Sequence, residues 1–128
     1  MGEKGPVKPK TSRQLAIECA RLCDDMKASE IALLDVRKLT FITDFFLVAT
    51  VSNERQARAI AEEMSQAMRS RGRHAINPSP RRQAGWILMD FSDVVAHLFS
   101  PDLRRFYDIE SLWADAPPIA WQLARQKK

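Results

Sequence analysis

The sequence predicts an α/β (α+β) fold in a single domain. Two segments space their apolar residues as amphipathic helices do, and several short apolar runs, rich in β-branched and aromatic residues, have the length of strands. A chain of 128 residues is long enough to bury roughly two thirds of the surface that its unfolded form exposes. We therefore expect it to fold without metals or disulfides.

The first helix is expected over residues 12–28. The residues from Thr11 to Gln14 resemble a capping box, and apolar side chains follow at helical spacing. Cys19 and Cys23 lie four residues apart on that apolar stripe, and we expect them to be buried free thiols. A redox or metal pair is the weaker alternative, because neither a CxxC motif nor a His/Cys cluster accompanies them.

Two strands and a second helix are expected next. The apolar runs 31–36 and 45–51 are strand candidates, and the residues between them are expected to form a loop. Residues 52–53, Ser-Asn, are suited to cap a helix, and Gly72 is a natural stop for it. The polar face of this helix mixes both charges, which favours a solvated face over a phosphate-binding one.

The second half of the chain is expected to form three more strands and a short helix. A short strand around residues 73–77 precedes an exposed loop, and residues 86–99, WILMDFSDVVAHLF, supply two further strands. Ser100 and Pro101 then provide the cap and the first residue of a helix over 101–110.

The charge is concentrated at the two ends of the chain. We interpret residues 1–11 as a disordered basic arm, 12–117 as the domain and 118–128 as a basic C-terminal tail, helical or frayed. Residues 1–13 carry a net charge of +3 and residues 114–128 one of +2, whereas the rest of the chain holds 13 basic and 14 acidic residues. The ends therefore predict loose, non-specific attraction to polyanions, without an RNA-reading face in the domain.

The sequence also bears on where the protein acts. No apolar run is long enough to cross a bilayer, and the N-terminus lacks the apolar core of a signal peptide. It also lacks the arginine-rich amphipathic helix typical of a transit peptide. We expect no membrane contact and a location in the bacterial cytoplasm.

Residues 86–99 place two carboxylates and a histidine in an apolar run. A two-residue turn at Phe91 and Ser92 would set the strand register. The expected pairs are Asp90 with Asp93, Leu88 with Val95, and Trp86 with His97. One face is then wholly aliphatic and belongs to the core: Ile87, Met89, Val94, Ala96 and Leu98. The opposite face has an acidic end and is available for function: Trp86, Leu88, Asp90, Asp93, Val95, His97 and Phe99.

Three interpretations compete for Asp90 and Asp93. In the first, their side chains accept hydrogen bonds from backbone N–H groups of the turn. In the second, they dock a basic partner, because no Lys or Arg occurs between residues 82 and 104 to neutralise them. A metal or acid/base site is the weakest interpretation, because only His97 offers a further ligand. A lone histidine such as His97 is more often a hydrogen-bonded sheet residue than a ligand. A tryptophan in the position of Trp86 more often packs within the protein than anchors a partner.

Several blocks of the sequence stand in a characteristic order. They are LLDVRKLTFITDFFLVATVSNERQARAIAEEM at 33–64, GWILMDFSDVVAHLFSPDLRRFYDIESLW at 85–113, and ADAP at 114–117. Over about residues 13–117 the chain resembles the ribosomal silencing factors, also called the Iojap family. Ser92 departs from the family pattern, which usually has a glycine in the hairpin turn, and this leaves the exact strand register open.

The resemblance carries expectations about fold and function. It implies a mixed β-sheet of about five strands flanked by helices, nucleotidyltransferase-like without catalytic residues. It also implies binding to the large ribosomal subunit through ribosomal protein number fourteen, where the bound protein blocks joining of the small subunit and so represses translation. Members of the family are often homodimers, so we expect a homodimer when the protein is free, and we expect no cofactor, metal or enzymatic activity.

The hairpin supplies the candidate partner-binding residues. Trp86 and Leu88 are expected to be apolar anchors, with Asp90 and Asp93 as partners for Lys or Arg of a basic ribosomal protein. Asp44 is a weaker candidate from the neighbouring loop. The alternative function is a metal-dependent nucleotidyltransferase-like enzyme that uses these three aspartates, and a generic RNA-binding module acting through the basic ends and the arginine face of the second helix is weaker still.

Overall fold

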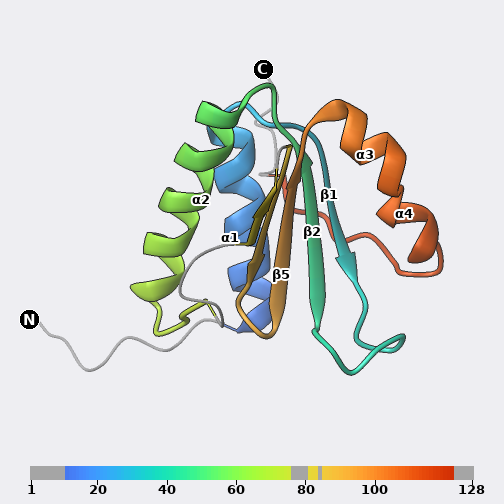
Figure 1. Ribbon diagram of the computed structural model, residues 1–128. Helices are drawn as coiled ribbons and strands as arrows, with labels where there is room; N and C mark the ends of the chain where they lie inside the picture. Colours follow the sequence, from blue (N-terminus) through green and yellow to red (C-terminus); the bar gives the residue numbers. More distant parts are fainter. Residues whose placement is uncertain (1–10, 76–80, 84, 123–128) are drawn as a thin grey trace, which may run out of the picture.

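The computed structural model describes residues 11–75, 81–83 and 85–122, which form a three-layered domain. A five-stranded sheet in the order β1-β2-β5-β4-β3 has two long helices on one face and two short ones on the other (Figure 1). The elements are α1 Ser12–Asp25, β1 Ser29–Asp35, β2 Phe45–Thr50, α2 Glu54–Arg69, β3 Arg81–Gln83, β4 Trp86–Asp90, β5 Val94–Phe99, α3 Pro101–Tyr107 and α4 Ile109–Leu112. The predicted mixed sheet of about five strands flanked by helices is confirmed.

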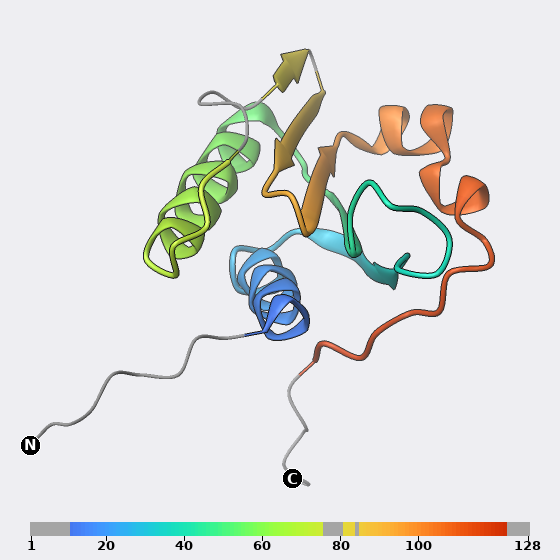
Figure 2. The same cartoon turned by 90° about the horizontal axis from the view of Figure 1, so that it is seen from below.

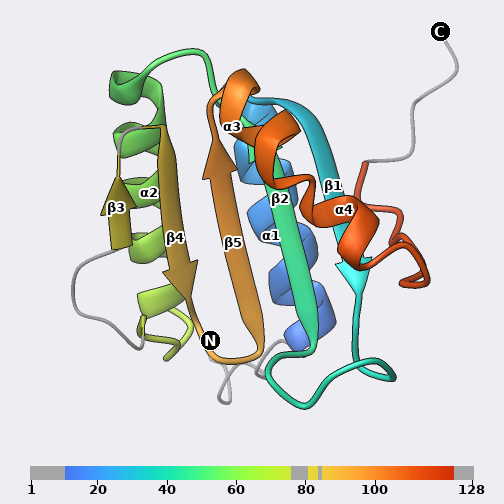
Figure 3. The same cartoon turned by 45° about the vertical axis from the view of Figure 1, so that its right-hand side comes forward.

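One parallel pair organises this sheet. β2 and β5 run parallel in its centre, whereas the β1–β2, β4–β5 and β3–β4 pairs are antiparallel. The chain leaves β2 toward α2 on one face and leaves β5 toward α3 on the other face (Figure 3). The two faces are therefore covered by different parts of the sequence.

The two long helices begin where the sequence predicts and differ at their ends. Thr11 forms the predicted capping box with Gln14, but α1 ends at Asp25, because the chain turns into the left-handed region at Lys27 (φ 75°). The side chain of Asn53 accepts a hydrogen bond from the Gln56 N–H and caps α2 as predicted. Gly72, with φ of +78°, lies just after the end of α2.

The main core lies between the sheet and the pair α1 and α2. It contains the predicted aliphatic face of the hairpin, the apolar stripes of both helices and much of β2. Cys19 and Cys23 are buried there as free thiols, as predicted. Burial raises the pKa of both thiols, that of Cys23 to about 12, so they stay protonated and serve as packing residues.

Two predicted elements differ from the structure. A strand was expected at 73–77, but residues 73–75 are irregular, so the prediction is wrong for them. The strand beside β4 is β3, further along the chain. Residues 76 and 77 lie outside the described part. The single helix expected over 101–110 is broken at Asp108, which adopts a left-handed conformation (φ 47°) between α3 and α4.

The C-terminal segment belongs to the fold. Ile119 and Trp121 are buried in the main core, and the Ile119 N–H donates to the carbonyl of Leu33 at 2.8 Å. Residues 119 and 121, which lie in the predicted C-terminal tail, therefore pack on the core of the domain. Residues 123–128, and residues 1–10 of the predicted arm, lie outside the described part of the chain. Among the described helices, none combines the length and apolar character that crossing a bilayer requires.

Gly85 is the position where the backbone leaves no room for a side chain. Its φ is +82°, and a Cβ added there would lie 2.9 Å from Oγ of Ser100. We predict that Gly85→Ala lowers the free energy of unfolding by about 2–3 kcal/mol, as measured by urea denaturation. Gly72→Ala is the matched control: its φ is also left-handed, but no atom lies within 4 Å. It should cost only about 1 kcal/mol, and an equal loss in both variants would contradict the proposed close contact.

Candidate partner-binding face

The hairpin of β4 and β5 has a different register from the predicted one. The observed pairs are Asp90 with Val95, Leu88 with His97, and Trp86 with Phe99. The turn lies one residue later because Phe91 is buried in the core, and Ser92 adopts the left-handed conformation (φ 80°) in its place. A shift of the turn by one residue moves each partner by two, so the strand residues keep the predicted division into two faces. Asp93 is the exception, because it lies in the turn and contacts Ser12 and Arg73.

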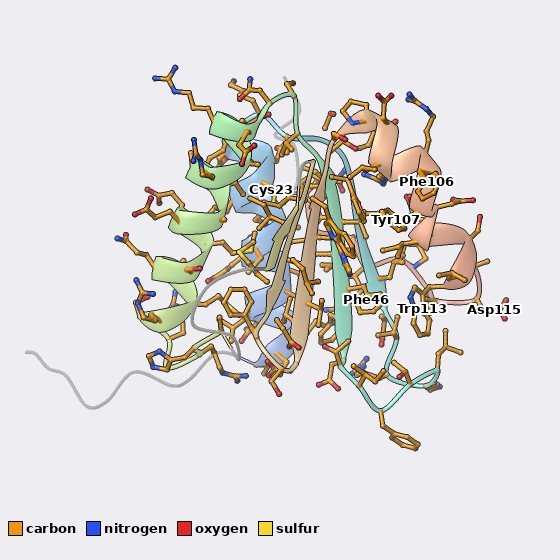
Figure 4. All side chains as sticks on the ribbon, in the orientation of Figure 1. Cys23, Phe46, Phe106, Tyr107, Trp113 and Asp115 are labelled. Atoms are coloured by element: carbon orange, nitrogen blue, oxygen red, sulfur yellow. The ribbon has the colours of Figure 1, made fainter. Side chains whose placement is uncertain are left out.

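Trp86, Leu88 and Asp90 alternate along β4 and lie on the sheet face that carries α3 and α4, because Trp86 packs on Tyr107 of α3. We call this the second sheet face. Six rings pack together on it, from β2, β4, β5, α3 and the C-cap of α4: Phe46, Trp86, His97, Phe99, Tyr107 and Trp113. Figure 4 labels three of them, Phe46, Tyr107 and Trp113. The Trp86 ring centroid lies 5.4 Å from that of Phe99 and 5.0 Å from that of Tyr107. Trp86 is therefore half-buried and packs within the protein, which favours the packing interpretation.

Arg104 ties the short helices to the sheet. Its guanidinium donates two hydrogen bonds to Glu110, at 2.9 and 2.6 Å. It also donates to Oγ1 of Thr50 at 2.9 Å and to the carbonyl of Glu30. Because neither α3 nor α4 contains a fully buried residue, this polar contact and the aromatic cluster hold the segment in place.

The short helices present large apolar side chains to solvent. Phe106 is 76% exposed and Leu112 is 75% exposed, and Tyr107 retains some exposure beside Trp86. Figure 4 shows Phe106 at the outer side of α3. Sequence reasoning missed these positions, although three consecutive residues of the helix, Arg-Phe-Tyr at 105–107, contain two rings that one helix face cannot bury together.

A second exposed apolar group lies in the loop between β1 and β2. Leu39, Phe41 and Ile42 are exposed there, and Phe41 makes no contact that shields its ring from solvent. These three residues were not predicted as site residues. The signal that could have found them is an apolar group within a loop that is otherwise polar.

Asp93 is engaged within the protein. Arg73, which follows α2, forms an ion pair with Oδ2 of Asp93, and Oγ of Ser12 donates to the same oxygen. Partial burial alone would raise the pKa of this carboxyl, but the hydrogen bond from Ser12 and the ion pair with Arg73 outweigh burial and lower it. Asp93 therefore has a basic partner within the protein, from outside the range between residues 82 and 104 that lacks Lys and Arg.

Asp90 and Asp44 keep more of their capacity to bind a partner. Oδ1 of Asp90 accepts the N–H of Ser92 at 2.8 Å, which is the predicted turn interaction. Both aspartates are half-buried, and neither has an ion pair within the described part of the chain. Asp44 also lies beside the hairpin turn, because its N–H donates to the carbonyl of Asp93 at 3.2 Å.

The three aspartates do not build the metal site that the alternative function requires. Among residues 11–75, 81–83 and 85–122, no three His, Cys, Asp or Glu side chains are grouped so that they could hold a metal ion. Asp93 faces Arg73 and Ser12. No observation on these residues favours metal-dependent chemistry.

His97 is buried and uncharged. Its ring stacks on that of Phe99 with a centroid separation of 5.7 Å, and Nδ1 accepts a hydrogen bond from the indole N–H of Trp86 at 3.4 Å. Nε2 is buried without a hydrogen-bond partner in the described structure. Burial lowers the pKa of His97 to about 4, so the ring is neutral near pH 7. His97 is a buried sheet residue as expected, but only one of its two ring nitrogens has a hydrogen-bond partner among the described residues.

Comparisons with known proteins place these features in a family. The model of the family "Ribosomal silencing factor during starvation" matches residues 9–128. A ribosomal silencing factor of Halalkalibacterium halodurans is 37% identical over 83% of this chain and 88% of its own length, and that of Bacillus subtilis is 36% identical over 77% and 83%. The chloroplast protein Iojap of Arabidopsis thaliana is 35% identical over 84% of this chain and 45% of its own length.

Solved structures agree with the sequence comparisons. A crystal structure of a Chromobacterium violaceum protein has a TM-score of 0.71 and 31% identity, and covers 92% of this chain and 96% of that one. A structure from Bacillus halodurans has a TM-score of 0.67 and 33% identity, covering 84% and 95%. Fold and sequence therefore lead to the same family.

The buried His97 predicts a specific loss of stability in mild acid. Its pKa is about 4 in the folded protein and 6.5 for an unperturbed histidine, so the unfolded chain binds a proton first as the pH falls from 6.5 toward 4. We predict that the free energy of unfolding is about 2 kcal/mol lower at pH 5 than at pH 7 from this residue alone, as measured by urea denaturation. His97→Phe should remove this difference. If the variant loses as much stability between the two pH values as the parent, His97 is not the group responsible.

Proposed function

Because the chain belongs to the family of ribosomal silencing factors, we propose that it binds the large ribosomal subunit through ribosomal protein number fourteen. The bound protein occupies space that the small subunit needs, so it prevents subunit joining and represses translation. This is a steric action, and it requires a binding surface but no reaction. We accordingly propose that the protein acts as a regulator and not as an enzyme, in the cytoplasm of a bacterium.

The binding surface is a strip along β4 that continues onto α3. We call it the β4 strip, and it consists of Phe106, Tyr107, Trp86, Leu88 and Asp90. The rings of Phe106 and Tyr107 lie 5.1 Å apart, and those of Tyr107 and Trp86 lie 5.0 Å apart. Trp86, Leu88 and Asp90 alternate along β4 and therefore lie on one face. The strip thus joins exposed apolar surface to a carboxylate.

The observation that carries the proposal is the exposed apolar surface at the α3 end of the strip. Phe106 is 76% exposed, and the chain itself covers Trp86 and Tyr107 only in part. Large exposed apolar groups beside a polar rim are typical of protein interfaces, and aromatic residues are enriched there. Asp90, which has no ion pair within the described residues, supplies a negative charge suited to the basic surface of a ribosomal protein.

The other predicted binding residues take different places in this proposal. Asp93 positions the hairpin turn through Arg73 and Ser12, and supports the strip without contacting the partner. Asp44 lies beside the same turn and contributes at the periphery. Leu112 extends the apolar surface onto α4.

The remaining sequence-based expectations become parts of the same proposal. The basic ends, with net charges of +3 and +2, add non-specific attraction to ribosomal RNA that weakens with salt. The protein forms a homodimer when free, because the exposed apolar groups of α3 and α4 need cover in the absence of the ribosome.

The first test is co-sedimentation of the protein with isolated large ribosomal subunits at fixed salt. We predict that Asp90→Lys weakens binding by about thirtyfold or more, since a desolvated charged contact is worth about 2 kcal/mol at least. It should also restore subunit joining when small subunits are added. Glu62→Lys is the control, because this exposed residue makes the same charge change on α2, behind the opposite face of the sheet. Unchanged binding by Asp90→Lys, or equal losses in both variants, would contradict the β4 strip.

A second variant separates binding from folding. Phe106→Ala should weaken binding to the large subunit by about tenfold or more, as loss of an aromatic anchor does. It should leave the unfolding midpoint in urea nearly unchanged, because the ring is largely exposed. A variant that binds normally would show that α3 lies outside the interface.

A further inference from the structure

A groove lies between α1 and α2, on the side of the protein away from the β4 strip. The two helices lie side by side against one face of the sheet, and the short helices lie beyond the other (Figures 1 and 2). The groove has a volume of about 490 Å³. Its lining residues are Glu18, Arg21, Leu22, Asp25 and Met26 from α1 and its cap, and Glu63 and Ala67 from α2.

The groove has an apolar floor because of helical spacing. Leu22 and Met26 are four residues apart on α1 and are only partly buried. Ala67 on α2 is too small to fill the space opposite them, so the groove stays open above the core. A groove of this kind can accept side chains of a polypeptide that binds there.

The rim of the groove is acidic. It carries three carboxylates, from Glu18, Asp25 and Glu63, against one guanidinium, that of Arg21. Arg21 directs Nε to the carbonyl of Trp121 at 2.7 Å, so it is held by the protein.

Two of the carboxylates are open to a partner. Within the described residues, Asp25 and Glu63 have no ion pair, and both are exposed. Glu18 is partly engaged by Arg71 at 3.4 Å.

We infer that this groove binds a lysine- or arginine-rich, partly apolar polypeptide segment of another protein. The charge complementarity argues for the basic residues, which would lie against Asp25 and Glu63, and the floor of Leu22 and Met26 argues for apolar side chains between them. A nucleic acid is disfavoured, because its phosphates would meet the carboxylates. The site is independent of the β4 strip, so a protein docked through the strip would keep this groove accessible.

The test uses a fluorescein-labelled peptide of alternating lysine and leucine, with fluorescence anisotropy as the readout on the full chain. We expect saturable binding that Glu63→Lys weakens by about tenfold or more, since a like charge then faces the peptide. Glu62→Lys, which makes the same charge change on the neighbouring exposed residue outside the groove, should change the affinity by less than about twofold. A peptide of alternating glutamate and leucine should not bind.

Each other outcome would overturn the inference. Equal losses in the two lysine variants would mean that binding follows overall charge, and no saturable binding would mean that the groove takes no basic segment. The chain's own residues 123–128, Leu-Ala-Arg-Gln-Lys-Lys, are the competing occupant. If their deletion raises the peptide affinity by about tenfold or more, the groove serves this segment and not another protein. Because these measurements use no ribosomes, their failure leaves the β4 strip untouched.

Discussion

The burial of β5 on both faces is the constraint on which the rest of the structure depends. All six of its residues are buried, with Val94, Ala96 and Leu98 toward the long helices. On the other side, Phe99 and the polar residue His97 are also shielded from solvent. The chain provides this shielding with its own α3 and α4, whereas Trp86, Leu88 and Asp90 of β4 stay partly exposed. The position that we propose for the binding surface follows from how the central strand is buried.

The two pairs of helices that cover the sheet are buried to different extents. α1 and α2 bury continuous apolar stripes, whereas α3 and α4 contain no fully buried residue and are held by Arg104 and by aromatic contacts. A thin cover leaves part of its own apolar surface exposed, including Phe106. Trp86 packs on Phe99 and also lies at the centre of the proposed β4 strip, so we propose that it serves both folding and binding. A partner that docks on the strip would complete the burial that the short helices begin.

Features set by local sequence could be predicted, and those set by distant contacts could not. The capping box at Thr11 and the alternation of β4 and β5 depend on neighbouring residues, and both were predicted correctly. The turn position was not, because the burial of Phe91 depends on helices far away in the chain. The role of Asp93 was missed for the same reason: its partner Arg73 lies 20 residues away.

The surface that we propose for binding was only partly predictable from the sequence. Leu88 and Asp90 stand out in the sequence as an apolar and an acidic residue on one strand face, but the exposure of Phe106 depends on how α3 lies on the sheet. Hydrogen–deuterium exchange of the protein, alone and bound to large ribosomal subunits, tests the proposed binding surface most directly. We predict slower exchange in the turn after Asp90 and in α3 and α4, with α1 and α2 unchanged. Slower exchange in α1 and α2, with none in α3 and α4, would contradict it.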